Sequence, residues 1–390
     1  MSRTTLTVGS RAYTVSFDEE RRRGDLYQSV VIAQLVDELT EQPVQGGVLV
    51  TTDMRSARVK TAGSGIGGVV GVPSRLFPGL DAKPYAFDVR FEVDGFAPLV
   101  QPHVAVPQQP GFPGGFGDVD LGRLALRRLP VAIVVRTTQL DNQNHVVALP
   151  GATVEVTAIW RRMQDLAGAP SGPEIVALRP ALYAARPQPG TTLEPVTMTP
   201  VAEPERVLRR AAEPGSRDLE VSRVGALAPG SVVGIDRSDP DRAEYIQVED
   251  VVGPSDPESP ATLVLAFPVR RSHRENGTVR EVTPAGLGPP TADLVDEGLP
   301  GDVTVFVSSV APFGGAPIVR ITGGLTPDEY VGAATFGVVT DAEGYGRLPP
   351  LSRVAAIEIA ASAAGPLTAP PTPFTPHYGL DENHLYLVLE

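Results

Sequence analysis

Four acidic side chains in one short segment are the first candidates for chemistry. They are Asp236, Asp239, Asp241 and Glu244, which lie in a turn between two apolar runs. Carboxylates at such short spacing suit Ca²⁺, a hard cation that prefers oxygen ligands. The residue order differs from the D-x-D-x-D-G pattern of a known calcium loop, and Arg237 and Arg242 stand in the same turn. The segment is therefore either a weak Ca²⁺ site or a solvated turn, and the arginines favour the turn.

Motifs for catalysis or cofactor binding are sparse in this chain. Residues 63–68 match the dinucleotide-binding pattern G-x-G-x-x-G, but residues 69–73 read VVGVP and cannot open the helix that holds a pyrophosphate. Neither a Walker phosphate loop nor a G-x-S-x-G nucleophile elbow occurs. The five histidines fall singly, and the absence of cysteine removes thiol catalysis and Cys-ligated zinc. We therefore predict that the chain is not an enzyme, with no catalytic residue, no cofactor and no metal site beyond the weak acidic candidates.

Two aromatic features are candidates for contact with a partner. Phe112 and Phe116 lie in a Gly- and Pro-rich loop that offers little core for them to enter, so a partner protein is one way to bury them. Trp160, the single tryptophan, ends an alternating run, which favours packing over a sugar-binding platform. An adhesive module that binds carbohydrate or protein at these positions is the alternative to the function developed below.

The elements that position these residues are predicted to be strands. The chain has 390 residues, of which 40 are Gly and 40 are Pro, whereas average usage of the two together is roughly 12%. Because Pro lacks a backbone donor and Gly weakens helices, this density excludes a helical bundle or a doubly wound α/β enzyme. Hydrophobic residues make up 42% of the chain and charged residues 20%, which leaves enough apolar surface for folded cores. The sequence thus predicts an all-β protein with little helix.

The charge balance limits the partners. The chain has 33 basic and 46 acidic residues, a formal net charge of −13, and no basic cluster, which argues against nucleic acid. The first residues lack the continuous apolar stretch of a signal peptide, and no later run is long enough to span a membrane. The expectation is synthesis in the cytosol without a signal peptide.

Alternating apolar residues and an internal repeat indicate how the chain is organised. Residues 85–93 carry a strict period-two run, typical of an antiparallel strand with one buried face. Pro214-Gly215 and Pro300-Gly301 each precede two similar strands and a third that begins with Glu-Tyr, at residues 244–245 and 329–330. We expect the two copies to pack as a pseudo-symmetric pair within one domain, because one copy alone is too small to close a core.

Three segments resemble the carboxypeptidase regulatory-like, or transthyretin-like, β-sandwich. They are the hairpin Ile32–Asp53, the segment Gly151–Val154 and the turn with its following strand at Thr340–Pro349. The region 230–279 resembles small β modules of phage tail and contractile injection system baseplate proteins. The resemblance implies tandem antiparallel sandwiches of Ig-like or prealbumin-like type, a duplicated β insert within the second sandwich, and an architectural role.

Together these patterns predict five regions. They are N-terminal strands and a linker at 1–27, a first sandwich at 28–129, a second sandwich split between 130–205 and 335–365, the duplicated insert at 206–334, and a Pro-rich arm with a C-terminal strand at 366–390. The apolar residues of that strand are Leu385, Tyr386, Leu387, Val388 and Leu389. A semi-rigid arm that ends in such a strand is suited to adding onto the sheet of a neighbouring subunit.

The expected function is that of a non-catalytic structural or adaptor subunit of a multi-protein assembly. A phage-tail-like contractile injection particle is the assembly that the resemblance favours. The partners are other subunits, either further copies of this chain or different proteins, with neither nucleic acid nor a membrane span involved. Release of such a particle by lysis would reconcile cytosolic synthesis with an extracellular destination.

Overall fold

A computed structural model shows an all-β protein, as the composition predicts. It describes residues 2–8, 11–17, 28–45, 47–52, 58–62, 65–71, 85–106, 119–172, 174–182, 187–254, 256–315, 317–322, 327–365 and 367–390. Helix is limited, in these residues, to two short 3₁₀ segments at Met163–Ala167 and Ala311–Phe313. No helix in the described part of the chain is long and apolar enough to cross a membrane. The contacts divide the chain into two units, Met1–Leu129 with Arg161–Ala167, and Pro130–Trp160 with Gly168–Glu390.

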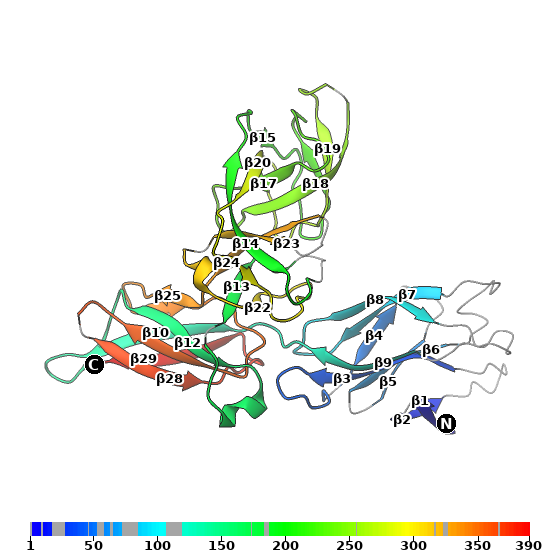
Figure 1. Cartoon of the computed structure of the whole chain (residues 1–390), viewed down its shortest axis with the longest axis horizontal. Helices are drawn as coiled ribbons and strands as arrows, with labels where there is room; N and C mark the ends of the chain where they lie inside the picture. The colour runs from blue at the N-terminus through cyan, green and yellow to red at the C-terminus, as the bar shows by residue number, and fades with distance from the viewer. Residues whose placement is uncertain are drawn as a thin grey trace. The chain divides into compact units, whose positions relative to one another are not determined.

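The N-terminal unit is built around a first β-sandwich (Figure 1). Its strands are β3 (Gln28–Asp37), β4 (Leu49–Thr52), β5 (Arg58–Ala62), β6 (Ile66–Gly71), β7 (Tyr85–Glu92), β8 (Leu99–Val106) and β9 (Val119–Leu126), and a separate hairpin joins β1 (Ser2–Val8) to β2 (Arg11–Phe17). The two sheets have the orders β5-β6-β3-β9 and β4-β7-β8, and β3 runs parallel to β9. Leu35, Val50 and Phe91 are fully buried, so apolar residues of both sheets form the core.

A second sandwich in the other unit repeats this plan. Its strands are β10 (Ala132–Leu140), β11 (Val146–Ala148), β12 (Thr153–Trp160), β25 (Gly337–Val339), β26 (Tyr345–Arg347), β27 (Ala356–Ser362), β28 (Thr368–Phe374) and β29 (Glu382–Leu389). One sheet contains β11, β10, β26 and β29, and the other has the order β25-β12-β27-β28. The first and last strands, β10 and β29, run parallel, as β3 and β9 do in the first sandwich.

One backbone arrangement fixes the correspondence between the two sandwiches. In the first, Leu35 N–H donates to the carbonyl of Gly65 at 2.7 Å, and the Leu35 carbonyl accepts from Val44 at 3.1 Å. In the second, Thr137 N–H donates to Gly344 at 2.8 Å, and the Thr137 carbonyl accepts from Leu149 at 3.0 Å. Both glycines have positive φ, 71° and 78°. The same strand, turn and glycine therefore recur in both sandwiches, and Gly344 lies in the turn predicted at residues 340–349.

The C-terminal residues differ from the arm expected at 366–390. β28 pairs with β27 and β29 pairs with β10, so both strands belong to the sheets of the second sandwich. Ala369, Leu387 and Leu389 are buried in its core. The alternation at 385–389 correctly indicates a strand with one apolar face, but that face is covered by the chain's own sandwich. Pro370, Pro371 and Pro373 suit β28 because it is an edge strand.

The insert between β12 and β25 forms a twelve-stranded sheet system with pseudo-two-fold symmetry. Its strands are β13 (Ile175–Arg179), β14 (Thr192–Pro200), β15 (Arg206–Val207), β16 (Asp218–Val221), β17 (Val232–Ile235), β18 (Glu244–Val252), β19 (Ala261–Leu265), β20 (Thr278–Gly286), β21 (Ala292–Asp293), β22 (Thr304–Phe306), β23 (Ile318–Thr322) and β24 (Glu329–Ala334). From the central pair β20–β14, the order runs β17, β18, β19, β16 on one side and β23, β24, β13, β22 on the other. Tyr245 pairs with its counterpart Tyr330, as a two-fold axis between the copies requires.

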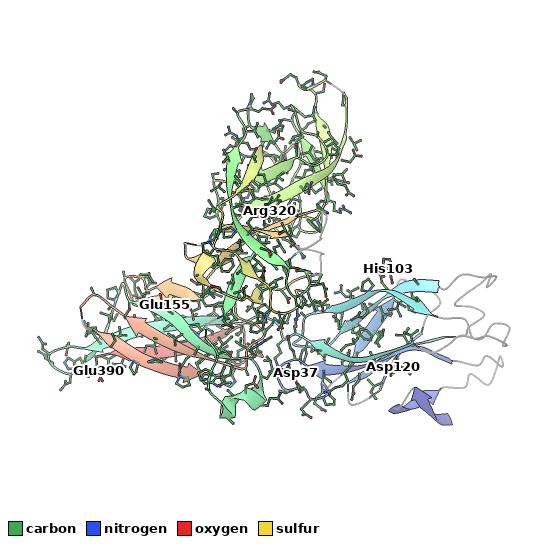
Figure 2. The ribbon with its side chains drawn as sticks, in the orientation of Figure 1. Asp37, His103, Asp120, Glu155, Arg320 and Glu390 are labelled. Atoms are coloured by element: carbon green, nitrogen blue, oxygen red, sulfur yellow. The ribbon has the colours of Figure 1, made fainter. Side chains whose placement is uncertain are left out.

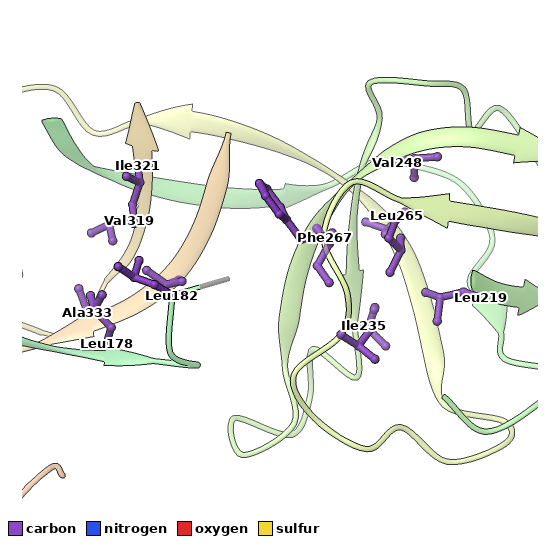
Figure 3. Close-up of a cluster of buried hydrophobic side chains, with 14 of the residues drawn as sticks. Leu178, Leu182, Leu219, Ile235, Val248, Leu265, Phe267, Val319, Ile321 and Ala333 are labelled. Carbon is purple, nitrogen blue, oxygen red and sulfur yellow. The ribbon is translucent and has the colours of Figure 1, made fainter. Parts of the chain in front are cut away.

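Each copy closes into a small barrel. In the first barrel, β15 pairs with β20, and a bridge between Leu208 and Val221 joins β15 to β16. In the second barrel, β21 pairs with β14, and the equivalent bridge joins Leu294 to Val307. Figure 3 shows the buried side chains of both: Leu219, Ile235, Val248 and Leu265 belong to strands of the first barrel, and Leu178, Val319, Ile321 and Ala333 to strands of the second.

The first barrel is continuous in sequence, whereas the second is split around it. The second barrel takes β13 and β14 from before the first barrel and β21 to β24 from after it. The sheet thus begins at residue 175, earlier than the boundary predicted at 206. The Pro-rich composition of 163–205 obscures the strands of this region in the sequence. Pro195 in β14 is tolerated because it lies between the residues that pair with β21 and those that pair with β20, where no N–H is needed.

Strands β13 and β22 are buried on both faces. Ile175, Ala177 and Phe306 contribute to the core of the second sandwich. The alternate residues Val176, Leu178 and Val305 contribute to the core of the barrels. A strand with apolar residues at every position is typical of burial on both sides. One pair of strands therefore serves two hydrophobic cores.

The glycine at the common turn gives a test of the sandwich geometry. A Cβ at Gly344 would lie 2.6 Å from the carbonyl oxygen of Thr137, whereas Gly151, with a φ of 69°, has nothing within 4 Å of such a Cβ. We expect Gly344→Ala to lower the free energy of unfolding by about 3 kcal/mol. The matched change Gly151→Ala should cost about 1 kcal/mol, for its φ alone. Urea denaturation of both variants checks this, and equal losses would contradict it.

Candidate functional site

The acidic turn divides into an exposed pair and a buried pair. Asp241 is exposed and forms an ion pair with Arg179 at 2.6 Å. Asp239 lies 3.6 Å from Arg242 and accepts a hydrogen bond from the backbone of Asp241. Arginines therefore neutralise both carboxylates. Arg242 does so as the sequence suggested, whereas the partner of Asp241 is Arg179 and Arg237 donates to the carbonyl of Met198 instead.

The buried pair holds a histidine that the sequence did not connect with it. His273 Nδ1 lies 2.9 Å from Asp236 Oδ2, and its Nε2 lies 3.3 Å from Glu244 Oε1. Both His273 and Glu244 are fully buried. Glu244 also accepts hydrogen bonds from the backbone N–H groups of Arg270 and Arg271. The geometry is that of an imidazolium bridging two carboxylates inside the first barrel.

Nearby carboxylates control the charge of His273. Burial alone would lower the pKa of its imidazole, but the hydrogen bonds to Glu244 and Asp236 outweigh burial, and the pKa is raised above its ordinary value. His273 is brought to the turn by a backbone bridge with Ala212, with N–H···O distances of 2.9 and 2.8 Å. Nothing in the spacing of His273 along the sequence predicts this, because the bridge depends on barrel closure.

The second barrel keeps only part of this arrangement. Glu329 pairs with Ile321 as Glu244 pairs with Ile235, and both glutamates are buried. Pro187 occupies the place of His273, since its carbonyl accepts from Gly298 as that of His273 accepts from Ala212. Within the described residues, no group of three His, Asp or Glu side chains is arranged to hold a metal ion. The partly buried Asp236 and the buried His273 and Glu244 thus form a structural ion group that, among the described residues, occurs in the first barrel and not in the second.

The predicted interaction residues have different outcomes. Phe112 and Phe116 lie outside the described residues. Trp160 donates its indole N–H to the carbonyl of Gly168 at 3.2 Å, which ties the ring to its own chain. The third group, 385–389, forms most of β29.

β29 presents two different faces. Leu387 and Leu389 are buried, and Leu385 packs against the same core of the second sandwich. Tyr386 and Val388 point the other way and are exposed. The strand therefore anchors itself with one face and offers apolar side chains on the other.

The exposed side chains of β29 belong to a wider apolar surface on one sheet, which we name the C-terminal outer face. Pairing places Tyr386, Arg136 and Tyr345 in one row across β29, β10 and β26, with Val388 beside Thr138 and Val146 beside Leu140 in the rows that follow. The exposed fractions of its apolar members are Tyr345 39%, Tyr386 64%, Val388 42%, Leu140 48% and Val146 65%. Exposed apolar side chains that gather on one sheet face are a feature of protein–protein interaction sites. Figure 2 marks Glu390, which follows the end of β29.

Arg136 stands at the centre of this face. Its guanidinium lies over the ring of Tyr345, 5.0 Å from the centroid, and its Nε is enclosed without a hydrogen-bond partner among the described residues. Glu382, a carboxylate on the same face of β29 as Tyr386, forms an ion pair with Arg347 at 2.7 Å instead. Sequence reasoning identified Tyr386 and Val388 but missed Arg136 and Tyr345, because only the pairing of β10 with β26 and β29 brings them together.

The first sandwich lacks this surface at the equivalent place. The backbone correspondence puts Gln34 at the position of Arg136 and Ile66 at that of Tyr345, and Gln34 pairs with Arg123 on the last strand. Arg123 donates to the carbonyl of Glu41 at 2.6 Å. The Tyr–Arg–Tyr row is therefore not required by the fold.

Comparisons with protein-family models, with curated proteins and with solved structures find no match to this chain.

Two carboxylates of the acidic turn should differ sharply in their effect on stability. Glu244→Gln leaves the His273 imidazolium with one carboxylate in a buried site, so we expect a loss of about 3–5 kcal/mol in the free energy of unfolding. Asp241→Asn removes only an exposed ion pair and should change stability little. Urea denaturation of the two variants measures the contrast, and a Glu244→Gln variant as stable as the parent would contradict it.

The raised pKa of His273 also predicts a pH dependence. The folded state holds this proton more tightly than the unfolded chain, so the contribution of His273 is complete below a pH of about 6.5 and is lost as pH rises through the folded pKa. Each unit of pKa shift corresponds to about 1.4 kcal/mol. We expect hydrogen exchange of β17 and β20 amides to report a falling opening free energy above that pH. His273→Gln should remove this slope, and a slope that survives in the variant would refute the assignment.

Proposed function

We propose that this chain is a non-catalytic structural or adaptor subunit of a multi-protein assembly. The observation that carries the proposal is the C-terminal outer face, where five large apolar side chains lie exposed on one sheet. Apolar side chains that are exposed on a sheet face cost free energy in water. This free energy is recovered when a partner covers them. The equivalent row of the first sandwich holds Ile66, Gln34 and Arg123 in place of Tyr345, Arg136 and Tyr386, so the fold does not require two tyrosines at these positions.

The join between the second sandwich and the barrels supports the same role. Because β13 and β22 are buried on both faces, the sandwich and the barrels share apolar side chains across a common pair of strands. A packed join of this kind holds the second sandwich and the barrels rigidly together, which a flexible linker does not. Such rigidity suits a subunit that links other proteins in an assembly.

β29 offers a second means of attachment. Among the described strands it pairs only with β10, and its end exchanges backbone hydrogen bonds between Glu390 and Thr368 at 3.2 Å. We propose that a neighbouring subunit adds a strand to the other edge of β29. The assembly we propose is a phage-tail-like contractile injection particle, supported by the resemblance of residues 230–279 to baseplate modules. In that setting the chain is made in the cytosol and leaves the cell with the particle on lysis.

The test is whether the native protein sediments within a particle. We expect the chain in an extract of its source cells to sediment far ahead of a monomer, in a fraction that electron microscopy shows to contain tail-like particles. Sedimentation of the native protein as a free monomer would overturn the proposal.

Substitutions then show whether the C-terminal outer face makes the attachment. Tyr386→Ser combined with Val388→Ser should release the chain from the particle, because both side chains are exposed and their loss leaves the core intact. Val339→Ser is the matched control, since Val339 is 63% exposed on the other sheet of the same sandwich. Deletion of 366–390 is unsuitable, because it removes core residues of β28 and β29. Equal incorporation of the double variant and the control would remove this face from the proposal.

A further inference from the structure

We infer that the C-terminal outer face binds a protein segment that carries a carboxylate between apolar side chains, and that the carboxylate pairs with Arg136. The inference names the chemistry of the partner and rests on the function proposed above. The binding residues on this chain are Arg136, Tyr345, Tyr386, Val388, Leu140 and Val146.

The charge of Arg136 is uncompensated on its own face. Among the described residues, the guanidinium of Arg136 takes part in no hydrogen bond or ion pair, and its one partner is the ring of Tyr345. Glu382 is engaged by Arg347 at 2.7 Å and lies 3.9 Å from His384. A half-buried guanidinium with donors to spare is best satisfied by a carboxylate, which accepts two of its N–H groups at once.

The apolar surroundings decide what must flank that carboxylate. Tyr386 and Tyr345 lie on either side of Arg136 in the same row, and Val388, Leu140 and Val146 extend the face beyond it. Apolar side chains of the partner would cover these residues and exclude water from the ion pair. A charge pair sheltered in this way interacts more strongly than one in bulk water.

Comparison of the two sandwiches argues that Arg136 is kept for binding. The first sandwich has Gln34 at the equivalent position, with the same backbone hydrogen bonds on either side. Glutamine therefore satisfies the fold at this place. A positive charge between two tyrosines is an addition that folding does not need.

A two-fold contact between copies of this chain fits the face poorly. Such a contact places the same patch on both sides of the axis, so the two Arg136 side chains would approach one another. Like charges without a counterion oppose association. The partner is accordingly a different surface, one that brings negative charge.

Selection of peptides by the full chain tests the inference. Random peptides displayed on phage are selected on the immobilised protein, and an enriched peptide is synthesised together with its Glu→Gln or Asp→Asn version. We expect enriched peptides to share an acidic residue flanked by apolar residues. The amide version should bind about tenfold more weakly, a difference of about 1.4 kcal/mol.

Matched variants of the protein assign the effect to Arg136. Arg136→Gln copies the residue of the first sandwich and should weaken the acidic peptide about tenfold, while leaving the affinity of the amide version almost unchanged. Arg210→Gln removes the same charge from an exposed site of the first barrel and should change either affinity by less than about threefold. Near-UV circular dichroism of each variant should match the parent, which shows that the fold is retained.

Several outcomes would overturn the inference. They are selected peptides without an acidic residue, equal binding of the acidic and amide peptides, an Arg136→Gln variant that binds like the parent, or a concentration-dependent dimer that Tyr386→Ser abolishes. Binding of glycans on an array that depends on Tyr386 would overturn it as well. Peptide selectivity through Arg136 in a protein that sediments as a monomer would leave the inference standing while the assembly role fails. If Arg136→Gln leaves particle incorporation unchanged and the selected peptides show no preference for an acidic residue, the inference fails while the assembly role stands.

Discussion

The burial of β13 and β22 on both faces is the constraint on which the second unit depends. Side chains at alternate positions of these strands enter different cores, Ile175 and Phe306 that of the sandwich and Val176 and Val305 that of the barrels. Neither core is complete without this shared pair, because a strand side exposed to water would lose the free energy of apolar burial. Arg353 adds to the join: this buried residue of the second sandwich has its guanidinium 5.0 Å from the ring of Phe306 and 3.5 Å from Asp296. Insert and sandwich are therefore joined by packing as well as by chain connections.

The first barrel is inserted into the second barrel, which is itself inserted into the second sandwich. This arrangement follows from where the chain enters and leaves each module. The second barrel opens between β24 and β13, which are paired neighbours, at Ala334 and Ala177. In the first barrel the equivalent strands β18 and β19 are joined by a short loop. The second barrel is thus a circularly permuted copy of the first, opened at that loop to admit the sandwich strands. Insertion at paired neighbours is tolerated because the two ends lie close together and the fold of the host is not stretched.

The duplicated modules share the backbone features that define each fold and differ in side chains, at one surface of the sandwiches and in one interior of the barrels. Both sandwiches keep the glycine turn and the parallel pairing of first and last strands. They differ on the outer face, where one carries Gln34 and the other carries Arg136 between two tyrosines. The barrels differ similarly, since His273 with its carboxylates in the first is replaced by Pro187 in the second. The first difference creates a surface and the second stabilises an interior, which is why only the outer face supports the binding proposal.

Composition and local pattern were sufficient to determine the fold class, the alternating strand at 85–93, the turn at Gly344 and the existence of a repeat. These features depend on neighbouring residues, such as Pro and Gly that break helices and apolar residues that alternate on one face of a strand. Tertiary structure alone decided the partners of each strand. The apolar alternation of 385–389 was equally compatible with a neighbour's sheet, and only the register with β10 shows that Leu387 is core and Tyr386 surface. His273 and Arg136 became visible for the same reason, because the groups they face lie 29 or more residues away and are brought to them only by sheet pairing and barrel closure.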